Sequence, residues 1–520
     1  VCLSGCRQGA VPSALLAGDE DKAWQAAGQL HEIFGPDSFW IEVQQHSLPT
    51  DAWLAAALFS LAQKTGIGAV ITNNVHYAER SSQQLHDILS CIRQGVTLPE
   101  ALAGGLLHPN SEQFLKSHQE MEDLFYGALG YGAIAKALPQ ALRNTLHIAE
   151  RCNVCLDFSA NTSRGALPAF PVPEGHTPQS YLRHLCEIGV RHKFSNAYDG
   201  QETPNEIPLA QAREQLVHEL AVIERAKLAG YFLVVWDIVR FAREQGIRCQ
   251  GRGSAANSLV AYVLGITPVD PLRHNLLFER FLSETNSGAP HTMPDIDVDF
   301  AADRREEVIQ YVYNRYGEDH VGMVCNVVTY RARSALRETA KALAFPPDVV
   351  DRLAKTLDTR SCLQAAEELA VIGDLHPDLF SPEPSDVSPH PSSSSLPWRI
   401  LSEVLCQMGG IPRHLSIHVG GMLITAAPLV EVVPLERATM PGRVVVQWNK
   451  DSVEDAGLIK IDLLSLRTLG VIEEALDHIQ EQQGVTLDLD RLPMDGEPGS
   501  PSYAIYDLLQ RADTCLLYTS

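Results

Sequence analysis

The 520-residue sequence contains no apolar run of about eighteen residues, so no membrane span is predicted. It also lacks an excess of basic residues, because 41 Lys and Arg stand against 64 Asp and Glu, for a formal net charge of −23. That balance counts against a generally basic nucleic-acid-binding protein. An acidic chain can still line one groove with Lys and Arg, so net charge excludes little.

The sequence lacks the cysteine pattern of a disulfide scaffold or a zinc finger. Its 11 cysteines are scattered within apolar patterns, which is typical of a protein kept reduced in the cytoplasm. Cys152 and Cys155 form a CxxC pair near His147, but no second pair follows at zinc-finger spacing. We therefore expect core cysteines near a helix end rather than a zinc site, and a cytoplasmic location.

The sequence also lacks an initial Met and a basic-then-apolar leader. Residues 3–6 read Leu-Ser-Gly-Cys, as a lipoprotein cleavage box does, but no apolar segment precedes them for a signal peptidase to recognise. We expect an internal strand and turn at this point, with the natural N-terminus lying upstream.

Short apolar strands alternate with helices in the first third of the chain. The predicted strands are 39–43 and 69–72, and the predicted helices are 51–64 and 81–94. This alternation is typical of an α/β layer or barrel with parallel strands. The proline-rich stretch at 167–173 then predicts a linker and a domain boundary.

Beyond that linker the pattern changes from helices to mixed structure. Residues 208–245 are strongly helical, and Gly246 is the expected end of the second helix in this stretch. A basic helix is predicted at 333–343, and a mobile loop or insertion at the Ser- and Pro-rich residues 381–397. Further strands are predicted at 247–249, 444–448 and 458–463.

A glycine-rich segment follows the strand at 247–249, and residues 250–258 read Gln-Gly-Arg-Gly-Ser-Ala-Ala-Asn-Ser. The glycines allow a sharp turn, and Ser254 can cap the helix that continues beyond it. Free backbone N–H groups at such a helix start bind phosphate, and Arg252 adds a fork of donors. The closing Gly-Lys-Ser/Thr of a Walker loop is absent. A tight turn that binds no phosphate would have the same sequence pattern.

Residues 294–300 read Pro-Asp-Ile-Asp-Val-Asp-Phe, an alternation with the period of a strand. Asp295, Asp297 and Asp299 would then project from one face. Like charges so close repel, so a divalent cation is expected to bridge them, and hard oxygen ligands suit Mg²⁺. An EF-hand loop opens in the same way, but Phe300 stands where that loop needs glycine. Apolar neighbours also disfavour a solvated acidic turn.

A further acid lies on a second predicted strand, where Lys460 and Asp462 share a face. A structural ion pair would give the same pattern. Two carboxylates from one strand and one from another are, however, what two-metal phosphoryl transfer requires. In that chemistry one metal activates the attacking oxygen and the other stabilises the leaving phosphate.

These segments, in this order and spacing, resemble the palm of bacterial C-family DNA polymerases. The match comprises Gly-Arg-Gly-Ser at 251–254, Leu-Leu-Phe-Glu-Arg-Phe-Leu at 276–282, the acidic strand at 294–300 and residues 457–469. The resemblance implies that Asp295, Asp297 and Asp462 are catalytic carboxylates that bind two Mg²⁺ ions, with Asp299 in support. It implies contacts to the incoming triphosphate from Arg252, Gly253, Ser254, Arg280 and Lys460.

Three segments resemble the error-prone, damage-tolerance branch of this family. They are 249–258, Gly-Cys-Arg-Gln-Gly-Ala at 5–10, and Arg-His-Leu-Ser-Ile-His-Val-Gly-Gly at 413–421. The replicative alpha subunit typically has Gly-Pro before the Gly-Arg-Gly-Ser and a glycine where Asn257 stands. In the third segment the glycine pair allows close backbone approach, and Arg413 and His418 could face phosphates. The alternative interpretation of His418, as a buried core histidine, is kept.

The predicted helix at 333–343 carries Arg333, Arg337 and Lys341 at every fourth position, hence on one face. A solvated surface helix would look the same. Its place between the two acidic strands resembles the family's thumb, which implies contact with the backbone of primer–template DNA.

Residues 71–77 read Ile-Thr-Asn-Asn-Val-His-Tyr and resemble a strand of the PHP domain of the same polymerases, a metallophosphoesterase-like barrel. The family more often has Asp where Asn74 stands, and its His-x-His ligand segment would lie before Val1. His76 is a candidate metal ligand, but a complete ligand set cannot be assembled. We therefore do not expect exonuclease or pyrophosphatase activity from this domain.

The resemblance implies an α/β fold: a PHP-type barrel-like domain, truncated at its N-terminus, and a nucleotidyltransferase-type palm with an inserted helical thumb. The expected domains are 1–165 (PHP), 166–326 and 406–466 (palm), 327–405 (thumb) and 467–514 (start of the fingers). Residues 515–520 depart from the family after Thr514 and are expected to be an artefactual tail.

The function implied is that of an error-prone, translesion DNA-directed DNA polymerase, which adds a deoxynucleotide to a primer 3′-hydroxyl. Its implied partners are primer–template DNA and dNTPs, with a sliding clamp and damage-tolerance accessory proteins through regions outside this chain. Because most of the fingers are missing, the fragment itself is expected to be inactive. The replicative alpha subunit, a stand-alone PHP metallophosphoesterase and a non-catalytic DNA-binding scaffold remain alternatives.

Overall fold

The computed structural model describes residues 1–129, 136–155, 167–194, 208–282, 296–375, 396–487, 489 and 503–511. The chain forms two compact units. Unit 1 comprises Val1–Leu156 and Val328–His414, and unit 2 comprises Asp157–Val327 and Leu415–Ser520. Within the described ranges, no helix combines the length and apolar character needed to cross a membrane.

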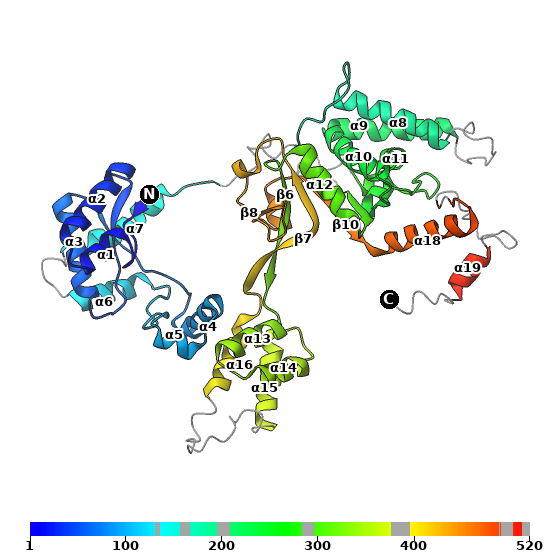
Figure 1. The fold of residues 1–520 in the computed structure, drawn as a ribbon. Helices are drawn as coiled ribbons and strands as arrows, with labels where there is room; N and C mark the ends of the chain where they lie inside the picture. Colours follow the sequence, from blue (N-terminus) through cyan, green and yellow to red (C-terminus); the bar gives the residue numbers. More distant parts are fainter. Residues whose placement is uncertain are drawn as a thin grey trace. The chain divides into compact units, whose positions relative to one another are not determined.

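The N-terminal part of unit 1 is a parallel α/β layer, as the alternation of strands and helices predicted (Figure 1). Strands β1 (Cys2–Leu3), β2 (Phe39–Val43) and β3 (Ala69–Ile71) pair in this order, all parallel. Helices around them are α1 (Ala10–Leu16), α2 (Glu20–Phe34), α3 (Asp51–Thr65), α6 (His118–Leu129) and α7 (Leu138–Arg151). Phe39, Ile41 and Val43 are fully buried and form the centre of this core.

The rest of unit 1 is a helical cluster. It contains η1 (Arg80–Ser82), α4 (Gln83–Gln94), α5 (Leu98–Ala103), α13 (Ala332–Ala342), α14 (Pro347–Thr356), α15 (Cys362–Leu375) and α16 (Leu396–Met408). Ile88 of α4 shares one apolar core with Leu336 of α13 and Leu401 of α16. The predicted thumb helices therefore pack against a helix pair from the predicted PHP region (Figure 1).

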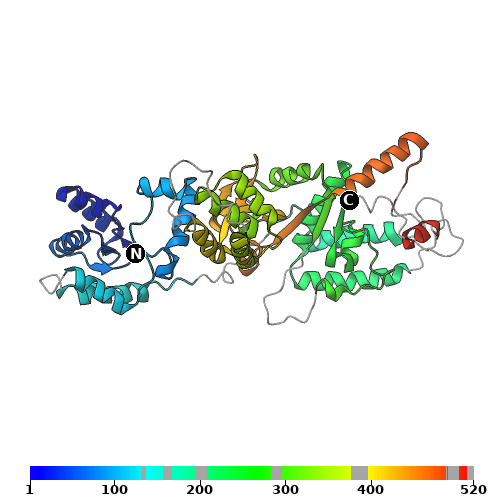
Figure 2. The same cartoon turned by 90° about the horizontal axis from the view of Figure 1, so that it is seen from below.

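Unit 2 is built on a sheet with the strand order β4-β5-β10-β7-β6-β9-β8. The strands are β4 (Cys249–Arg252), β5 (Asp297–Ala301), β10 (Lys460–Leu466), β7 (Pro412–Ile424), β6 (Val321–Thr329), β9 (Val444–Val446) and β8 (Leu435–Arg437). β5 runs parallel to β10 and antiparallel to β4, and β10 runs antiparallel to β7. β10 leads directly into the long helix α18 (Arg467–Gln483), drawn in orange in Figure 2.

The remaining helices of unit 2 precede, connect and follow these strands in the chain. They are α8 (Pro178–Phe194), α9 (Leu209–Arg225), α10 (Ala229–Glu244), η4 (Gly253–Asn257), α11 (Leu259–Val263), η5 (Phe278–Arg280), α12 (Arg305–Tyr316), η7 (Leu429–Glu431), α17 (Lys450–Asp455) and α19 (Tyr503–Gln510). α10 buries most of its apolar residues and belongs to the same core as Val298 of β5 and Ile461 of β10. Burial of this apolar face leaves the acidic residues of β5 on the other side of the sheet.

Most predicted elements are confirmed, with shifted ends. The helical stretch 208–245 is α9 and α10, and Gly246 has a φ of +69° directly after the second helix, as a C-terminal glycine should. The strand predicted at 247–249 instead begins at Cys249, and β10 begins at Lys460 and continues to Leu466. The predicted loop at 381–397 lies outside the described residues up to position 395, and Leu396 already begins α16. The tail at 515–520 is also outside them.

A candidate active site on the sheet of unit 2

Two of the three predicted catalytic carboxylates lie side by side. Asp297 is the first residue of β5, and Asp462 is its directly paired neighbour on the parallel strand β10. Adjacent strands are about 4.8 Å apart, and paired residues project from the same face. Two acids far apart in the chain are thereby brought together. Asp295 lies outside the described residues.

Two acids on this face are poorly hydrated, whereas the Asp297 side chain is 28% exposed. Asp462 is only 6% exposed, and Asp299, two residues further along β5 on the same face, is 3% exposed. Burial raises the pKa of the Asp299 carboxyl, and the positive charge of Arg252 opposes part of that rise. Carboxylates held this close and this dry favour a neighbouring cation.

Arg252 supplies one such charge from the next strand. It is paired with Asp297 across β4 and β5. Its Nε lies 3.5 Å from Asp297 Oδ2, and its Nη1 lies 3.5 Å from Asp299 Oδ1. These distances are ion-pair contacts rather than full hydrogen bonds, and half of the Arg252 side chain is exposed. The guanidinium thus contacts both acids and remains accessible to a ligand.

Lys460 and His418 lie at the other acid of the pair. The Lys460 ammonium donates to Asp462 Oδ2. His418 Nδ1 lies 3.7 Å from Asp462 Oδ1 and accepts a hydrogen bond of 2.8 Å from the Gly421 backbone N–H. A ring nitrogen that accepts carries no proton, so this geometry belongs to the neutral imidazole with its proton on Nε2. His418 therefore lies beside the acid pair as a neutral side chain, and Lys460 carries the local positive charge.

The glycine pair on β7 permits this close packing, as predicted. A Cβ on Gly421 would lie 2.9 Å from His418 Nδ1 and 3.2 Å from Asp462 Oδ1. A Cβ on Gly420 would lie 2.6 Å from Leu464 Cδ2. Since real Cβ atoms do not approach so closely, only glycine lets β7 lie against β10 here. Arg252, Asp297, Asp462 and Gly421 form one row across four adjacent strands.

The turn after β4 differs from its prediction. Gly253 has a φ of +65°, which favours glycine, and begins η4. The helix that follows begins at Leu259, and its N-cap is Ser258, whose Oγ accepts from the Ala261 N–H at 3.2 Å. The prediction that Ser254 caps this helix is therefore wrong, because the chain completes a 3₁₀ turn before the α-helix starts.

A buried carboxylate occupies the start of this helix. Glu219 of α9 accepts hydrogen bonds from the Leu259 and Val260 N–H groups, at 2.9 and 3.0 Å, and from Ser258 Oγ, at 2.9 Å. Burial raises the pKa of Glu219, and its hydrogen bonds oppose that rise. These N–H groups are already satisfied by the protein, so the start of α11 is not a free phosphate site. The sequence reasoning missed Glu219, since no local pattern links it to a helix that begins 40 residues later.

The other predicted contact residues lie in three places. Arg280 is exposed on η5, which packs beside η4. Arg413 belongs to unit 1 and forms a 2.6 Å ion pair with Glu338. The remaining cations, all exposed on α13 of unit 1, are Arg333, Arg337 and Lys341.

Two of these α13 cations have partners in the same unit. The guanidinium of Arg333 donates to the Leu357 carbonyl at 2.9 Å, and Arg337 pairs with Asp351. The Arg337–Asp351 pair is solvent-exposed and is therefore weak. All three cations nevertheless remain exposed to solvent.

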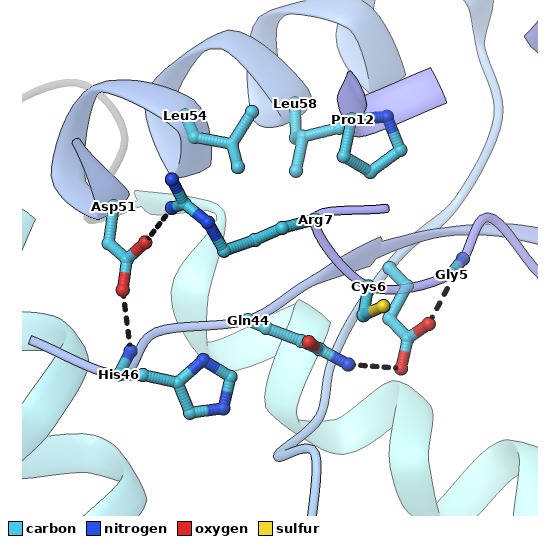
Figure 3. Close-up of a pocket in the computed structure, with 10 residues that line it drawn as sticks. Gly5, Cys6, Arg7, Pro12, Gln44, His46, Asp51, Leu54 and Leu58 are labelled. Carbon is cyan, nitrogen blue, oxygen red and sulfur yellow. Dashed lines mark hydrogen bonds and ion pairs between the residues drawn. The ribbon is translucent and has the colours of Figure 1, made fainter. Parts of the chain in front are cut away.

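The PHP-like part of unit 1 has a pocket beyond the ends of β1 and β2 (Figure 3). Its two acids are already engaged. Asp51 accepts from Arg7 and from the His46 N–H, and Glu42 accepts from the Gly5 N–H at 3.1 Å and from Gln44 and Thr72. These internal contacts leave no open pair of acidic oxygens in the pocket, so its residues do not fit a metal.

Cys152 and Cys155 follow α7, and both are exposed. The expectation that they lie in the core is wrong, although Cys152 does mark a helix end. Neither belongs to a group of three ligand-type side chains within the described ranges. All ten cysteines described are free thiols.

Comparison with known families matches one region that contains the acid pair and one at the N-terminus. Residues 180–465 match the model described as the bacterial DNA polymerase III alpha NTPase domain, and residues 1–46 match the PHP domain. The matched polymerase region includes Asp297, Asp462 and the Gly253 turn.

Several relatives bear the name Error-prone DNA polymerase. The protein from Mycolicibacterium paratuberculosis is 39% identical over 512 residues, covering 98% of this chain and 41% of its own length. That from Symbiobacterium thermophilum is 37% identical over 500 residues, covering 95% and 41%. That from Methylococcus capsulatus is 39% identical over 497 residues, covering 95% and 42%. The chain thus spans about two fifths of the length of these relatives.

Proposed function

The chain belongs to the bacterial C-family DNA polymerases, in their error-prone branch, and on that premise we propose that it is part of a DNA-directed DNA polymerase. The reaction is the attack of a primer 3′-hydroxyl on the α-phosphate of a deoxynucleoside triphosphate. The pairing of Asp297 with Asp462 on adjacent parallel strands carries this proposal. Such a pair of carboxylates is what two-metal nucleotidyl transfer requires.

The acid pair fits Mg²⁺ as its metal. Its donors are carboxylate oxygens, and Asp462 Oδ1 is buried and accepts no hydrogen bond from any described residue. We assign Asp297 and Asp462 as ligands, together with Asp295 from the segment that leads into β5. When bound, Mg²⁺ would activate the primer hydroxyl and stabilise charge on the reacting phosphate. Asp299 supports the acid pair indirectly: it contacts Arg252, which also contacts Asp297.

The cations around the acids are proposed to hold the triphosphate. Arg252 is half exposed and can turn from Asp297 toward phosphate oxygens, which its planar fork matches in geometry. Gly253 and Ser254 bring backbone close to the same place, and Arg280 lies on the neighbouring turn. Lys460 balances the charge of Asp462, and the neutral His418 can donate from Nε2 to a phosphate oxygen. Arg413 is a further phosphate contact in this proposal.

Helix α13 is proposed to contact the backbone of primer–template DNA. Its basic face consists of Arg333, Arg337 and Lys341, and phosphate contacts of this kind give affinity without sequence preference. The dNTPs and the duplex are the substrates. A sliding clamp and damage-tolerance proteins are proposed to bind regions beyond this chain, in the cytoplasm.

Primer extension by the full-length parent protein tests the acid pair. Asp297→Asn and Asp462→Asn each remove one charged metal ligand, so we expect extension to fall by roughly 100-fold or more. Asp348→Asn, on the exposed surface of α14, is the matched control and should leave the rate unchanged. Unaltered extension by the Asp297→Asn protein would contradict the two-metal assignment.

A further inference from the structure

One arginine joins the two strands that carry the Asp462 side of the candidate active site. Arg305 is the first residue of α12, and its guanidinium donates from Nε to the Leu463 carbonyl of β10, at 2.6 Å, and from Nη2 to the Val419 carbonyl of β7, at 2.5 Å. Leu463 directly follows Asp462, and Val419 directly follows His418. We propose that Arg305 is a positioning residue for the polymerase reaction, because it fixes the backbone that carries both side chains. This inference rests on the proposed function.

The guanidinium donates at the point where β7 and β10 stop pairing. Their antiparallel register ends with Asp462 opposite Gly421. Beyond that pair the strands stay in contact, since a Cβ on Gly420 would lie 2.9 Å from the Leu463 carbonyl oxygen. Backbone carbonyls beyond the end of a ladder have lost their strand partners and need other donors. Arg305 supplies a donor to one carbonyl on each strand, immediately beyond the pair that holds the acid.

The planar shape of a guanidinium suits this bridge. Its donors form a rigid fork, so two acceptors that bind it are held at a fixed separation. A lysine ammonium is a point charge on a flexible stem and has no such fork. Within the described ranges, both hydrogen bonds of Arg305 go to backbone carbonyls and none goes to a carboxylate. The side chain therefore acts as a spacer between two strands rather than as a member of an ion pair.

The helix that carries Arg305 is itself anchored in unit 2. It is held by three fully buried side chains, those of Val308, Ile309 and Val312. The Tyr313 hydroxyl donates to the Val444 carbonyl and accepts from the Val444 N–H, both at 3.2 Å. Glu306 pairs with Arg443. The bridge thus starts from a fixed element, as positioning of a reacting group to within about 0.5 Å requires.

The segment of β7 that carries His418 is held by hydrogen bonds more than by packing. His418 Nδ1 accepts from the Gly420 N–H, at 3.3 Å, and from the Gly421 N–H, at 2.8 Å, so the backbone curls around the ring. Val419 lies within this curl, and its side chain is 70% exposed. Core packing therefore does not hold Val419, whereas the bond from Arg305 does. Loss of that bond would let the ring move away from the acid beside it.

Primer extension by the full-length parent protein measures the effect on the reaction. Arg305→Gln removes the fork, and a displacement of about 1 Å at the reacting groups should lower kcat by roughly 10–100-fold. The KM for the nucleotide should change much less, because Arg305 is not proposed to touch the substrate. Arg305→Lys keeps the charge without the fork and should lose as much. Arg304→Gln, at the neighbouring position, removes an arginine bonded to Glu307 and is the matched control, with the kcat of the parent.

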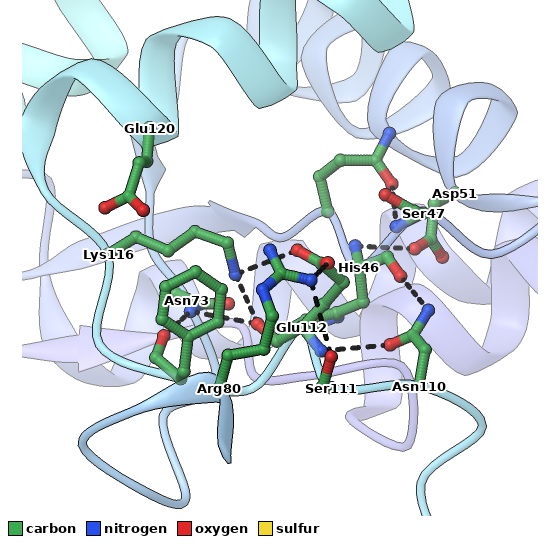
Figure 4. A network of polar contacts seen from close by, with 12 residues as sticks. His46, Ser47, Asp51, Asn73, Arg80, Asn110, Ser111, Glu112, Lys116 and Glu120 are labelled. Atoms are coloured by element: carbon green, nitrogen blue, oxygen red, sulfur yellow. Dashed lines mark hydrogen bonds and ion pairs between the residues drawn. The ribbon is translucent and has the colours of Figure 1, made fainter. Parts of the chain in front are cut away.

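Hydrogen exchange of the same proteins tests the bridge without the reaction. Amides at 419–423 and 461–466 should exchange faster in Arg305→Gln and in Arg305→Lys than in the parent. A second control, Arg80→Gln, removes a fork that serves Ser111 and Glu112 in the polar network of unit 1 (Figure 4). It should leave exchange in these two strands unchanged. Thermal unfolding checks that each variant is folded.

The possible outcomes separate this proposal from the proposed function. Normal extension by Arg305→Gln or by Arg305→Lys, or unchanged exchange in both, would overturn the positioning role. Faster exchange throughout unit 2 with a general loss of thermal stability would also overturn it, since Arg305 would then serve folding alone. If the unaltered parent extends no primer, the proposed function fails, whereas faster exchange confined to the two strands would still support the bridge.

Discussion

At the scale of single residues, the candidate active site depends on the absence of a Cβ atom at Gly421. Its missing side chain makes room for His418 Nδ1 and for Asp462 Oδ1, both of which a Cβ would meet at 3.2 Å or less. The absence of one methyl group therefore decides whether the acid pair keeps its geometry. Glu219 has the opposite role, because its carboxylate fills a place where backbone donors would otherwise be buried without partners.

Gly421→Ala should impair catalysis more than stability. The added Cβ would push His418 and Asp462 out of position, and overpacking of this kind costs about 1–3 kcal/mol. A 1 Å displacement at a reacting centre lowers rates by roughly 100-fold. Primer extension and thermal unfolding of the full-length protein measure the two effects. Gly230→Ala on α10 has open space at its Cβ and is the matched control. Normal extension by Gly421→Ala would refute this account of the site.

Glu219→Gln should loosen the start of α11. The Gln amide places a donor against the Leu259 or Val260 N–H, and a buried unsatisfied donor costs about 1–3 kcal/mol. Hydrogen exchange of the amides at 259–263 should therefore accelerate. Glu224→Gln, exposed on the same helix α9, should leave this exchange unchanged. If both variants exchange alike, Glu219 does not hold this turn.

At the scale of elements, α13 has a buried apolar face and an exposed basic face. Its buried stripe consists of Ala335, Leu336, Thr339 and Ala340, which pack into the core of unit 1. Its basic residues lie on the other face, in solvent. This division follows from helical periodicity alone and explains why the helix could be predicted from the sequence.

Lys341→Ala should weaken binding of primer–template DNA to the full-length protein without affecting stability. Loss of one phosphate contact lowers the slope of log affinity against log salt by about 0.9, equally for different DNA sequences. Fluorescence anisotropy at several salt concentrations measures that slope. Lys355→Ala, an exposed cation on α14, is the control. An unchanged slope for Lys341→Ala would remove α13 from the DNA-binding surface.

At the scale of the whole molecule, each compact unit is made of two stretches that are far apart in the chain. The regions expected to be a PHP domain and a thumb belong to one compact unit, in which Ile88 and Leu336 share one core. Segments more than 200 residues apart along the chain thus depend on each other for their stability, since neither buries its apolar face alone.

Ile88→Ala should therefore destabilise α13 as well as α4. Truncation of a fully buried Ile costs about 2–5 kcal/mol, and the cavity opens into the shared core. Hydrogen exchange at 332–342 should accelerate, while exchange in α10 of unit 2 should stay as it was. Leu54→Ala, in the separate core around β2, is the matched control and should spare α13. Acceleration confined to α4 would argue against a shared core.

The sequence by itself determined what depends on near neighbours. Strand alternation at 296–300 and the helices α9, α10 and α13 are all local patterns. Only the tertiary structure decided which distant residues meet. The register that sets Asp297 beside Asp462 and the reach of Glu219 to α11 both depend on packing between segments far apart in the chain. So does the meeting of the predicted ligand His76 with two other histidines. Local periodicity carries no information about such partners, because they are selected by the burial of apolar faces across the whole unit.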